Sequence, residues 1–316
     1  MTDYHAAPRP LLGIALKIIS TLAFSSMATL IKLVSDRYPV GEMAFFRSFF
    51  ALIPVFIWVG WRGAIPAVFY TPNFKGHVYR SLAGAAGMFC GFSALAHMPI
   101  ADATAIGYAA PLITVVLAFF LLGEQVRRYR WSAVLIGFAG VLIILSDYFG
   151  PEAHVASGSI EIGAIFAITG AFASALAATQ VRTLTRYEGA GTIVIYFSAL
   201  TSAAMLATLP FGWVMPPPGD AALLVLAGIF GGVGQVLMTL SYRYGDASTI
   251  APFDYTSMIW VLIVSLLIFG TWPTLTVLGG TAIVIGAGLF VIYREHRLGI
   301  ERRRAKEAQT PTTPLS

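Results

Sequence analysis

Long apolar runs separated by short polar segments dominate this sequence of 316 residues. Most runs hold about 20 residues, the length that a helix needs to cross a hydrocarbon core about 30 Å thick. Polar, proline or glycine residues separate them, as at Asp36–Pro39 and Pro216–Gly219. The pattern predicts ten transmembrane helices, at residues 11–34, 42–61, 80–98, 101–122, 131–147, 160–183, 191–214, 220–242, 247–270 and 274–293.

The continuity of these runs decides between the two kinds of membrane-spanning structure. Only helices and closed barrels satisfy their backbone hydrogen bonds in lipid. Barrel strands need short segments in which apolar and polar residues alternate, and these runs are long and unbroken. The sequence therefore predicts an all-α membrane protein.

The composition excludes the main alternatives to a membrane protein. Hydrophobic residues make up 57% of the chain and charged residues only 11%, whereas a soluble domain carries about 25% charged residues. A soluble enzyme, a disordered chain and a collagen-like fibre are therefore excluded. The single cysteine, Cys90, cannot form an internal disulfide, and its apolar surroundings predict a small buried side chain.

The positions of the basic residues predict the orientation in the membrane. The formal charge is +5, and most lysines and arginines fall on segments that would share one side of the bilayer. Basic residues mark the cytoplasmic side of membrane proteins, so both termini are predicted to be cytoplasmic and no nucleic-acid partner is needed to explain the charge. The first apolar run is too long for a signal peptide and is predicted to be a retained span.

The two halves of the chain contain matching short segments. Residues 101–104 (ADAT) match 245–248 (GDAS), and residues 138–142 match 286–290; Ala28, Thr29 and Lys32 match Ala178, Thr179 and Arg182. Five spans per repeat is an odd number, so the second copy is expected to be inverted, as in many secondary transporters. The expected units are an N-terminal segment at 1–10, a first repeat at 11–147, an outer loop at 148–159, a second repeat at 160–293 and a basic tail at 294–316.

Several motifs resemble the EamA-type carriers of the drug/metabolite transporter superfamily. They are Glu42–Arg47 (EMAFFR), Pro111-Leu112, Leu122–Glu124, Gly137–Gly140, Gly245–Ser248 and Ala251–Phe253. The resemblance covers about residues 11–293 and implies two inverted five-helix repeats, a central cavity and passage of a small organic solute. The second repeat departs from the first at Gly270-Thr271, where the first has Gly123-Glu124, so a symmetric pair of glutamates is not expected there.

Ionisable residues within the predicted spans mark a candidate solute pathway, because such residues are costly in lipid. Glu42 and Arg47 are five residues apart, which places them about 140° apart around a helix. They are therefore expected to face different neighbours. Arg47 can face the cavity as a partner for an anion, or both residues can form structural ion pairs near the outer interface.

Asp254 follows Pro252, which distorts the ninth predicted span and frees a backbone carbonyl. Its carboxylate can bind solute or a proton, or it can form a structural hydrogen bond to a neighbouring helix. The matching helix of the first repeat has Tyr108 and Pro111 but no acid. Carboxylate chemistry is therefore expected from one repeat only.

Aromatic residues make up 13% of the chain. They can pack between helices or form a stacking surface for a planar solute. The candidate solute-binding residues are Glu42, Arg47, Tyr108, Asp254, Tyr255 and Trp260. The five histidines lack metal-ligand spacing, and there is no nucleotide-binding loop or hydrolase motif. No catalytic residue, metal or cofactor is expected. The competing classes are an intramembrane enzyme, whose active site would need only two or three polar residues, and a channel, which would need a ring of polar or carbonyl ligands.

The sequence thus predicts a secondary transporter of a bacterial inner membrane, with a small organic solute and the lipid bilayer as its partners. The region from Glu42 to Pro54 is similar to that of carriers for vitamins and cofactor-like solutes. Riboflavin uptake is the leading expectation, because a flat ring suits an aromatic cavity with few charges. The alternatives are uptake of S-adenosylmethionine, a cation that would need Asp254 or Glu42 ionised, and efflux of amino acids or drugs.

Overall fold

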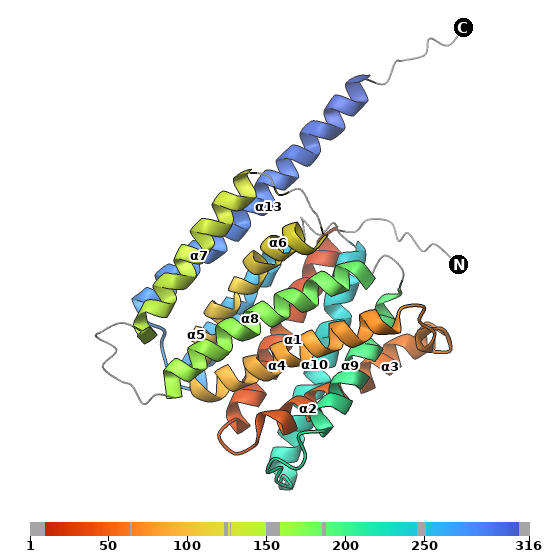
Figure 1. The fold of residues 1–316 in the computed structure, drawn as a ribbon, viewed down its shortest axis with the longest axis vertical. Coiled ribbons are helices and arrows are strands. Elements are labelled where there is room, and N and C mark those ends of the chain that lie inside the picture. The colour runs from red at the N-terminus through yellow and green to blue at the C-terminus, as the bar shows by residue number, and fades with distance from the viewer. Residues whose placement is uncertain are drawn as a thin grey trace.

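The computed structural model describes residues 10–63, 65–122, 126, 128–149, 159–184, 188–244 and 251–309. Every regular element in these residues is a helix (Figure 1). Residues 1–9, most of the expected loop at 148–159, the end of the tail at 310–316, Glu124 and the motif at 245–248 lie outside the described residues. The elements are α1 (Pro10–Val34), α2 (Val40–Phe50), α3 (Leu52–Trp61), η1 (Ala67–Phe69), α4 (Phe74–His97), α5 (Ile100–Gly107), α6 (Ala109–Leu122), α7 (Arg128–Phe149), α8 (Ser159–Leu184), α9 (Ala190–Leu206), α10 (Pro218–Tyr244), η2 (Ala251–Tyr255), α12 (Thr256–Leu267) and α13 (Leu275–Gln309).

Many of these helices have the length and composition of membrane spans. Among the described residues, seven stretches qualify: Leu11–Val34, Val40–Trp61, Ile100–Leu121, Arg128–Tyr148, Ile160–Val181, Pro218–Ser241 and Leu275–Arg294. Two shorter apolar helices, Ala190–Leu206 and Phe253–Leu267, lie between them in the sequence. The predicted all-α membrane fold is confirmed.

The surface of the helix bundle is apolar, as a surface in contact with lipid must be. On α7, Leu135 and Leu142 are 69% and 66% exposed, whereas Val141 and Ile144 are buried. The exposed pair is seven residues apart and therefore shares one helix face. In water such a face would be unstable, so this side of α7 is suited to hydrocarbon.

Proline breaks two of the predicted continuous spans. The run at 42–61 divides into α2 and α3 at Ala51, and the run at 101–122 divides into α5 and α6 at Tyr108. Each break lies three residues before a proline, Pro54 or Pro111. Proline has no N–H group to donate to the carbonyl four residues earlier, so the helical ladder is interrupted there.

Local sequence explains why α4 and α9 differ from the expected boundaries. Helix α4 begins at Phe74 rather than at residue 80, because the Asn73 side chain caps it by accepting a hydrogen bond of 3.0 Å from the Gly76 amide. Helix α9 ends at Leu206 rather than near residue 214. Pro210 follows, and Gly212 adopts a positive φ of 87° that favours glycine.

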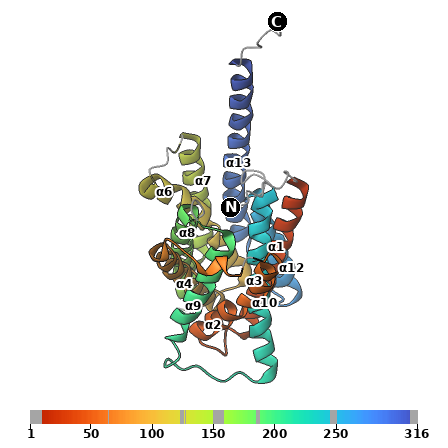
Figure 2. The same cartoon turned by 90° about the vertical axis from the view of Figure 1, so that its right-hand side faces the viewer.

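Three long helix pairs organise the bundle. Helix α1 packs on α10, α4 packs on α8, and α7 packs on α13. Figure 1 shows α7 beside α13, whose last turns extend away from the other helices, and Figure 2 shows the same extension after a 90° turn. Glycines permit two of these close contacts. A Cβ at Gly280 of α13 would lie 2.6 Å from the Gly140 carbonyl oxygen of α7, and a Cβ at Gly170 of α8 would lie 3.3 Å from the Gly87 oxygen of α4.

Polar contacts at the helix ends define the relative directions of α1, α4 and α8. Near the ends of α1 and α4, the Lys32 ammonium donates to the Leu95 carbonyl over 2.6 Å, so these helices run parallel. Thr71, just before α4, donates to Glu188, just after α8, over 2.5 Å. Helix α8 therefore runs antiparallel to α4, and also to α1.

Two polar clusters, which we call the first and the second clasp, connect segments that are far apart in the sequence. In the first clasp, Asp220 at the start of α10 pairs with Arg37 over 2.8 Å and accepts a hydrogen bond of 2.7 Å from Tyr38. In the second clasp, Glu188 accepts from Thr71 and lies 3.5 Å from the buried His77. The first clasp joins the end of α1 to the start of α10, and the second joins the end of α8 to the start of α4.

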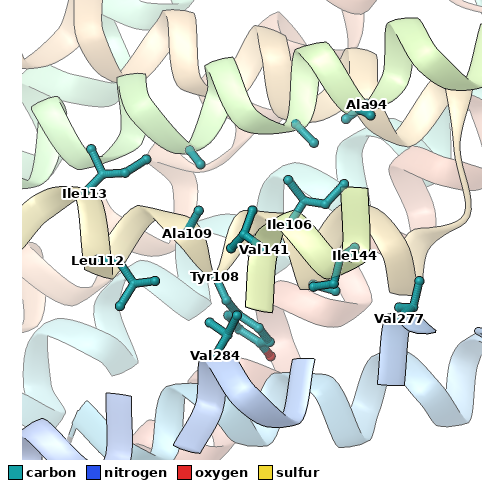
Figure 3. Close-up of a cluster of buried hydrophobic side chains, with 14 of the residues drawn as sticks. Ala94, Ile106, Tyr108, Ala109, Leu112, Ile113, Val141, Ile144, Val277 and Val284 are labelled. Carbon is teal, nitrogen blue, oxygen red and sulfur yellow. The ribbon is translucent and has the colours of Figure 1, made fainter. Parts of the chain in front are cut away.

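The largest described hydrophobic cluster lies between α5, α6, α7, α8 and α13. Figure 3 shows Tyr108 among Leu112, Val141 and Val284, which come from three different helices. This cluster attaches the α7–α13 pair to the rest of the bundle.

Candidate functional site

A cavity of about 640 Å³ lies in the middle of the helix bundle. Its walls come from α1, α2, α4, α5 and α6 in the first half of the chain, and from α8, α9 and α10 in the second half. Cavities of this size accommodate small organic molecules. The cavity is therefore a candidate solute site that both halves of the chain build together.

Small residues keep this cavity open. Helix α4 contributes Gly84, Gly87 and Gly91, and α5 contributes Gly107, while alanines dominate the part of the wall formed by α8. Added Cβ atoms at Gly91 and Gly107 would meet nothing within 4 Å, so both positions border open space. Larger side chains at these positions would fill the cavity.

Two arginines from neighbouring helices line the cavity beside one aromatic ring. The guanidinium carbon of Arg80, on α4, lies 4.0 Å from the centre of the Phe197 ring, and that of Arg47, on α2, lies 5.8 Å from the same point. Arg47 is only 6% exposed. Because both guanidinium groups lie over one ring, two positive charges are held close together.

Glycines on α4 and α10 make room for these two side chains. A Cβ at Gly231 of α10 would lie 3.1 Å from the Nε atom of Arg47, and a Cβ at Gly84 of α4, the helix that carries Arg80, would overlap the Nη1 atom of Arg80. A larger residue at either position would crowd the arginine beside it. The local sequence thus permits the arginines to occupy the space between α2, α4 and α10.

The charge of the arginines is not balanced within the described part of the chain. The Nε and Nη1 atoms of both Arg47 and Arg80 are buried and have no hydrogen-bond partner there. Contact with an aromatic ring contributes about 0.5–2 kcal/mol per cation, whereas an unpaired buried ion costs several kcal/mol. Phe197 therefore offsets only part of the cost, and the site retains capacity for an anion.

The remaining cavity wall has little charge. Its polar side chains include Thr104, Ser174 and Gln235, and the described lining residues include no Asp or Glu. Three methionines and three phenylalanines add polarisable apolar surface: Met27, Met88, Met238, Phe24, Phe92 and Phe197. The site combines a positive end with an adaptable apolar wall.

Glu42, a candidate from the sequence, does not line the cavity. Its side chain is buried and accepts a hydrogen bond of 3.1 Å from the backbone amide of Val214, in the segment between α9 and α10. This contact fastens α2 to that segment. Glu42 thus has a structural partner at the start of α2, whereas Arg47 lies in the last turn of this helix.

Asp254 and Trp260 both contact α1 rather than the cavity. The Asp254 carboxylate lies 2.6 Å from the ammonium of Lys17, which is 1% exposed. The Trp260 indole donates to the hydroxyl of Thr21 over 3.2 Å. These contacts attach η2 and α12 to α1, and neither residue is among those that line the cavity.

The structure brings Tyr108 and Tyr255 together but places them in the packed core. Their ring centres are 5.3 Å apart and meet edge to face, and the Tyr108 hydroxyl is 2.7 Å from that of Ser257. The Tyr255 hydroxyl occupies the space beside Gly288 of α13, where a Cβ would overlap it. Neither ring borders the cavity.

Arg47 is therefore the one member of the six sequence candidates that lines the cavity in the structure. The sequence pattern does not reveal Arg80 and Phe197. It predicts that the third span begins at residue 80, which places Arg80 at the membrane surface. Asn73 is a strong helix-capping residue, and it was the available sign that the helix begins earlier and carries Arg80 into the bundle. No local signal indicates Phe197.

The fold and cavity define a multi-pass membrane protein with a solute-sized chamber between its halves. The sequence profile of the EamA-like transporter family matches this chain twice, at residues 11–146 and 161–294. The chain belongs to the EamA-like transporter family. It is a membrane transporter of small-molecule solutes and not an enzyme.

Named relatives are similar over nearly their whole length. An S-adenosylmethionine uptake transporter of Rickettsia bellii is 27% identical over 289 residues, covering 90% of this chain and 95% of the relative. A pseudopaline exporter of Pseudomonas aeruginosa is 26% identical over 278 residues, covering 86% and 93%. A protein of known crystal structure is 19% identical, with a TM-score of 0.65 over 92% of this chain and 99% of that one, and supports the fold alone.

Proposed function

We propose that this protein is a secondary carrier for an amino-acid-derived metabolite, with S-adenosylmethionine as the first solute to test. Relatives of this chain are named for S-adenosylmethionine uptake, which favours this alternative over the riboflavin uptake expected from the aromatic content. The position of the expected ring-stacking residues agrees, because Tyr108, Tyr255 and Trp260 are not among the residues that line the cavity. Alternating access would carry the solute through that cavity.

The proposal includes ten spans arranged as two repeats, at 11–147 and 160–293. Ten spans result when each proline-broken pair, α2 with α3 and α5 with α6, counts as one span and η2 with α12 as another. The packing supports such a symmetry. The first span of each half packs on the third span of the other half, α1 on α10 and α8 on α4, and the two fifth spans, α7 and α13, pack on each other.

Inversion of the second repeat is supported by helix direction. The first helices of the two halves, α1 and α8, run antiparallel, as the contacts of Lys32 and Glu188 require. The two clasps also correspond to each other: the first joins the end of α1 to the start of α10, and the second joins the end of α8 to the start of α4, so each joins the first span of one half to the third span of the other. An inverted repeat allows the carrier to open to either side by exchanging the conformations of its two halves. With basic residues on the inner side, both termini would lie in the cytoplasm of a bacterial cell.

The observation that carries the proposal is that residues from both matched halves line one cavity. The test is uptake of radiolabelled S-adenosylmethionine by proteoliposomes containing the purified protein, with protein-free liposomes as the background. We expect saturable uptake that unlabelled S-adenosylmethionine suppresses and riboflavin does not. Suppression by riboflavin alone, or uptake equal to the background, would reject this solute.

A matched pair of variants links uptake to the cavity. Gly91→Phe places a ring in the open space of the cavity, and Gly279→Phe places the same ring on the exposed face of α13, where a Cβ also meets nothing within 4 Å. We expect Gly91→Phe to abolish uptake and Gly279→Phe to retain it. Uptake through the Gly91→Phe protein at the normal rate would place the solute path elsewhere.

Export of a metabolite rich in carboxylates is a second candidate function. The two cavity arginines and the absence of an acid among the described lining residues favour it. The similarity to a relative named as a pseudopaline exporter favours the export direction. Everted membrane vesicles, which accumulate exported solutes, distinguish the two directions of transport when they are compared with right-side-out vesicles.

A further inference from the structure

We propose that Arg47 and Arg80, held over the ring of Phe197, form a carboxylate-binding subsite within the central cavity. This subsite is called the arginine pair below. The inference rests on the proposed carrier function and narrows the class of solute to molecules that bear a carboxylate, such as α-amino acids and their derivatives. The solute's carboxylate would occupy the arginine pair, and its apolar body would extend along the glycines of α4.

Within the described part of the chain, the arginine pair has no counter-ion. The Nε and Nη1 atoms of both residues are buried without hydrogen-bond partners in the described residues. Glu42, on α2, is engaged with the Val214 amide, and Glu188, beside the start of α4, is engaged with Thr71 and His77. Structural arginines in a bundle are normally paired, because an uncompensated buried charge is costly. The missing partner is therefore expected to arrive with the solute.

The geometry of the arginine pair suits a carboxylate. Guanidinium groups present forked N–H donors that match the two oxygens of a carboxylate. An aromatic ring beneath such a group holds its plane and leaves its edge free to donate. Gly84 and Gly231 leave the space that both side chains occupy. The site is thus built around the arginines, and lysines in the same positions would lack the fork.

The end of the cavity that holds the arginine pair differs chemically from the rest of the cavity. Beyond the arginine pair, the wall consists mainly of glycine, alanine, methionine and phenylalanine. Such a surface accepts an apolar or ring-bearing body of variable shape. S-adenosylmethionine offers a carboxylate to the arginine pair and an adenosyl group to the apolar wall, while its sulfonium and ammonium groups have no acidic partner among the described lining residues. Its carboxylate is the feature that the arginine pair would recognise.

The test compares S-adenosylmethionine with decarboxylated S-adenosylmethionine, which differs from it only at the carboxylate. Binding is measured to wild-type protein in nanodiscs and to the Arg47→Met and Arg80→Met variants. Arg62→Met is the matched control, because Arg62 also lies over an aromatic ring, that of Trp58 at 4.8 Å, but at the end of α3 outside the cavity. Loss of one partner of a buried charge pair predicts a Kd about 30-fold or more higher in each cavity variant.

We expect wild-type protein to prefer S-adenosylmethionine over its decarboxylated form by a similar factor, and this preference should disappear in Arg47→Met and Arg80→Met. The Arg62→Met protein should bind like wild type. Two results would overturn the arginine pair while leaving the carrier proposal intact: equal binding of both solutes by wild type, or unchanged binding of S-adenosylmethionine by the cavity variants.

Thermal unfolding without solute provides a readout that does not depend on the choice of solute. Removing an unpaired buried charge predicts that Arg47→Met and Arg80→Met unfold at the wild-type temperature or above it. A fall in the unfolding midpoint of either variant would indicate a structural arginine and overturn the subsite. If wild-type protein binds neither solute, transport of S-adenosylmethionine is rejected, and a fall in either midpoint would still overturn the arginine pair.

Discussion

The contact between α7 and α13 offers a controlled test of the packing, because two adjacent glycines of α13 have opposite surroundings. A Cβ at Gly280 would lie 2.6 Å from the Gly140 carbonyl oxygen and 2.5 Å from Cγ1 of Ile144, whereas a Cβ at Gly279 would meet nothing within 4 Å. Alanine at Gly280 must therefore push the two helices apart. Such overpacking costs about 1–3 kcal/mol.

The neighbouring substitution removes the main confounding effect. Replacing a helical glycine with alanine stabilises the helix by about 0.5–1 kcal/mol, and this gain applies equally to Gly279→Ala and Gly280→Ala. The difference between the two variants therefore measures the contact alone. We expect Gly280→Ala to be less stable than Gly279→Ala by about 1–3 kcal/mol, measured by steric trapping in bicelles. Equal stability of the two variants would show that α7 and α13 are not in close contact at this level.

Further predictions concern the polar contacts. Lys17→Met and Asp254→Asn should each lower the unfolding midpoint. Because the two residues pair with each other over 2.6 Å, the double variant should lose less stability than the two single variants together. Additive losses of stability would indicate independent roles. If Asp254→Asn abolishes uptake at unchanged stability while Lys17→Met does not, Asp254 acts on solute or protons instead. Asp220→Asn should cost about 1 kcal/mol or less, since Arg37 is 53% exposed, and a much larger loss of stability in thermal unfolding would contradict that estimate.

The helices could be predicted from the sequence because their signal is local. A run of about 20 apolar residues identifies a span wherever the span packs, and the observed breaks at Ala51 and Tyr108 precede prolines that are visible in the sequence. The boundaries that differed depend on shorter signals, such as the capping side chain of Asn73. These signals were present but weaker than the hydropathy pattern.

Fewer of the site residues could be predicted from the sequence, because the site depends on which helices pack together. The angle between Glu42 and Arg47 on one helix correctly indicated different neighbours, and the structure places Glu42 beside Val214 and Arg47 over Phe197. The partner that brings Arg47 and Arg80 together, Phe197, lies in the other half of the chain. No spacing of residues within one helix predicts the contact of both arginines with Phe197.

The same limit applies to the aromatic residues. A stacking site would contain aromatic side chains such as those of Tyr108, Tyr255 and Trp260. In the structure, these side chains instead pack or hydrogen-bond between helices. Burial in a packed core and exposure to a cavity require the same residue types. Only the packing of the surrounding helices separates the two roles.

The central claim, that the cavity opens to each side of the membrane in turn, can be tested at one position. Gly91 borders the cavity with nothing within 4 Å of an added Cβ, and Cys90 is the single native cysteine. A Gly91→Cys protein in a Cys90→Ala background therefore carries one thiol in the cavity. We expect a membrane-impermeant maleimide to label this thiol from either side of the membrane, that is, in right-side-out and in everted vesicles. We also expect S-adenosylmethionine to slow the labelling. Labelling from one side only, unaffected by the solute, would contradict the central claim.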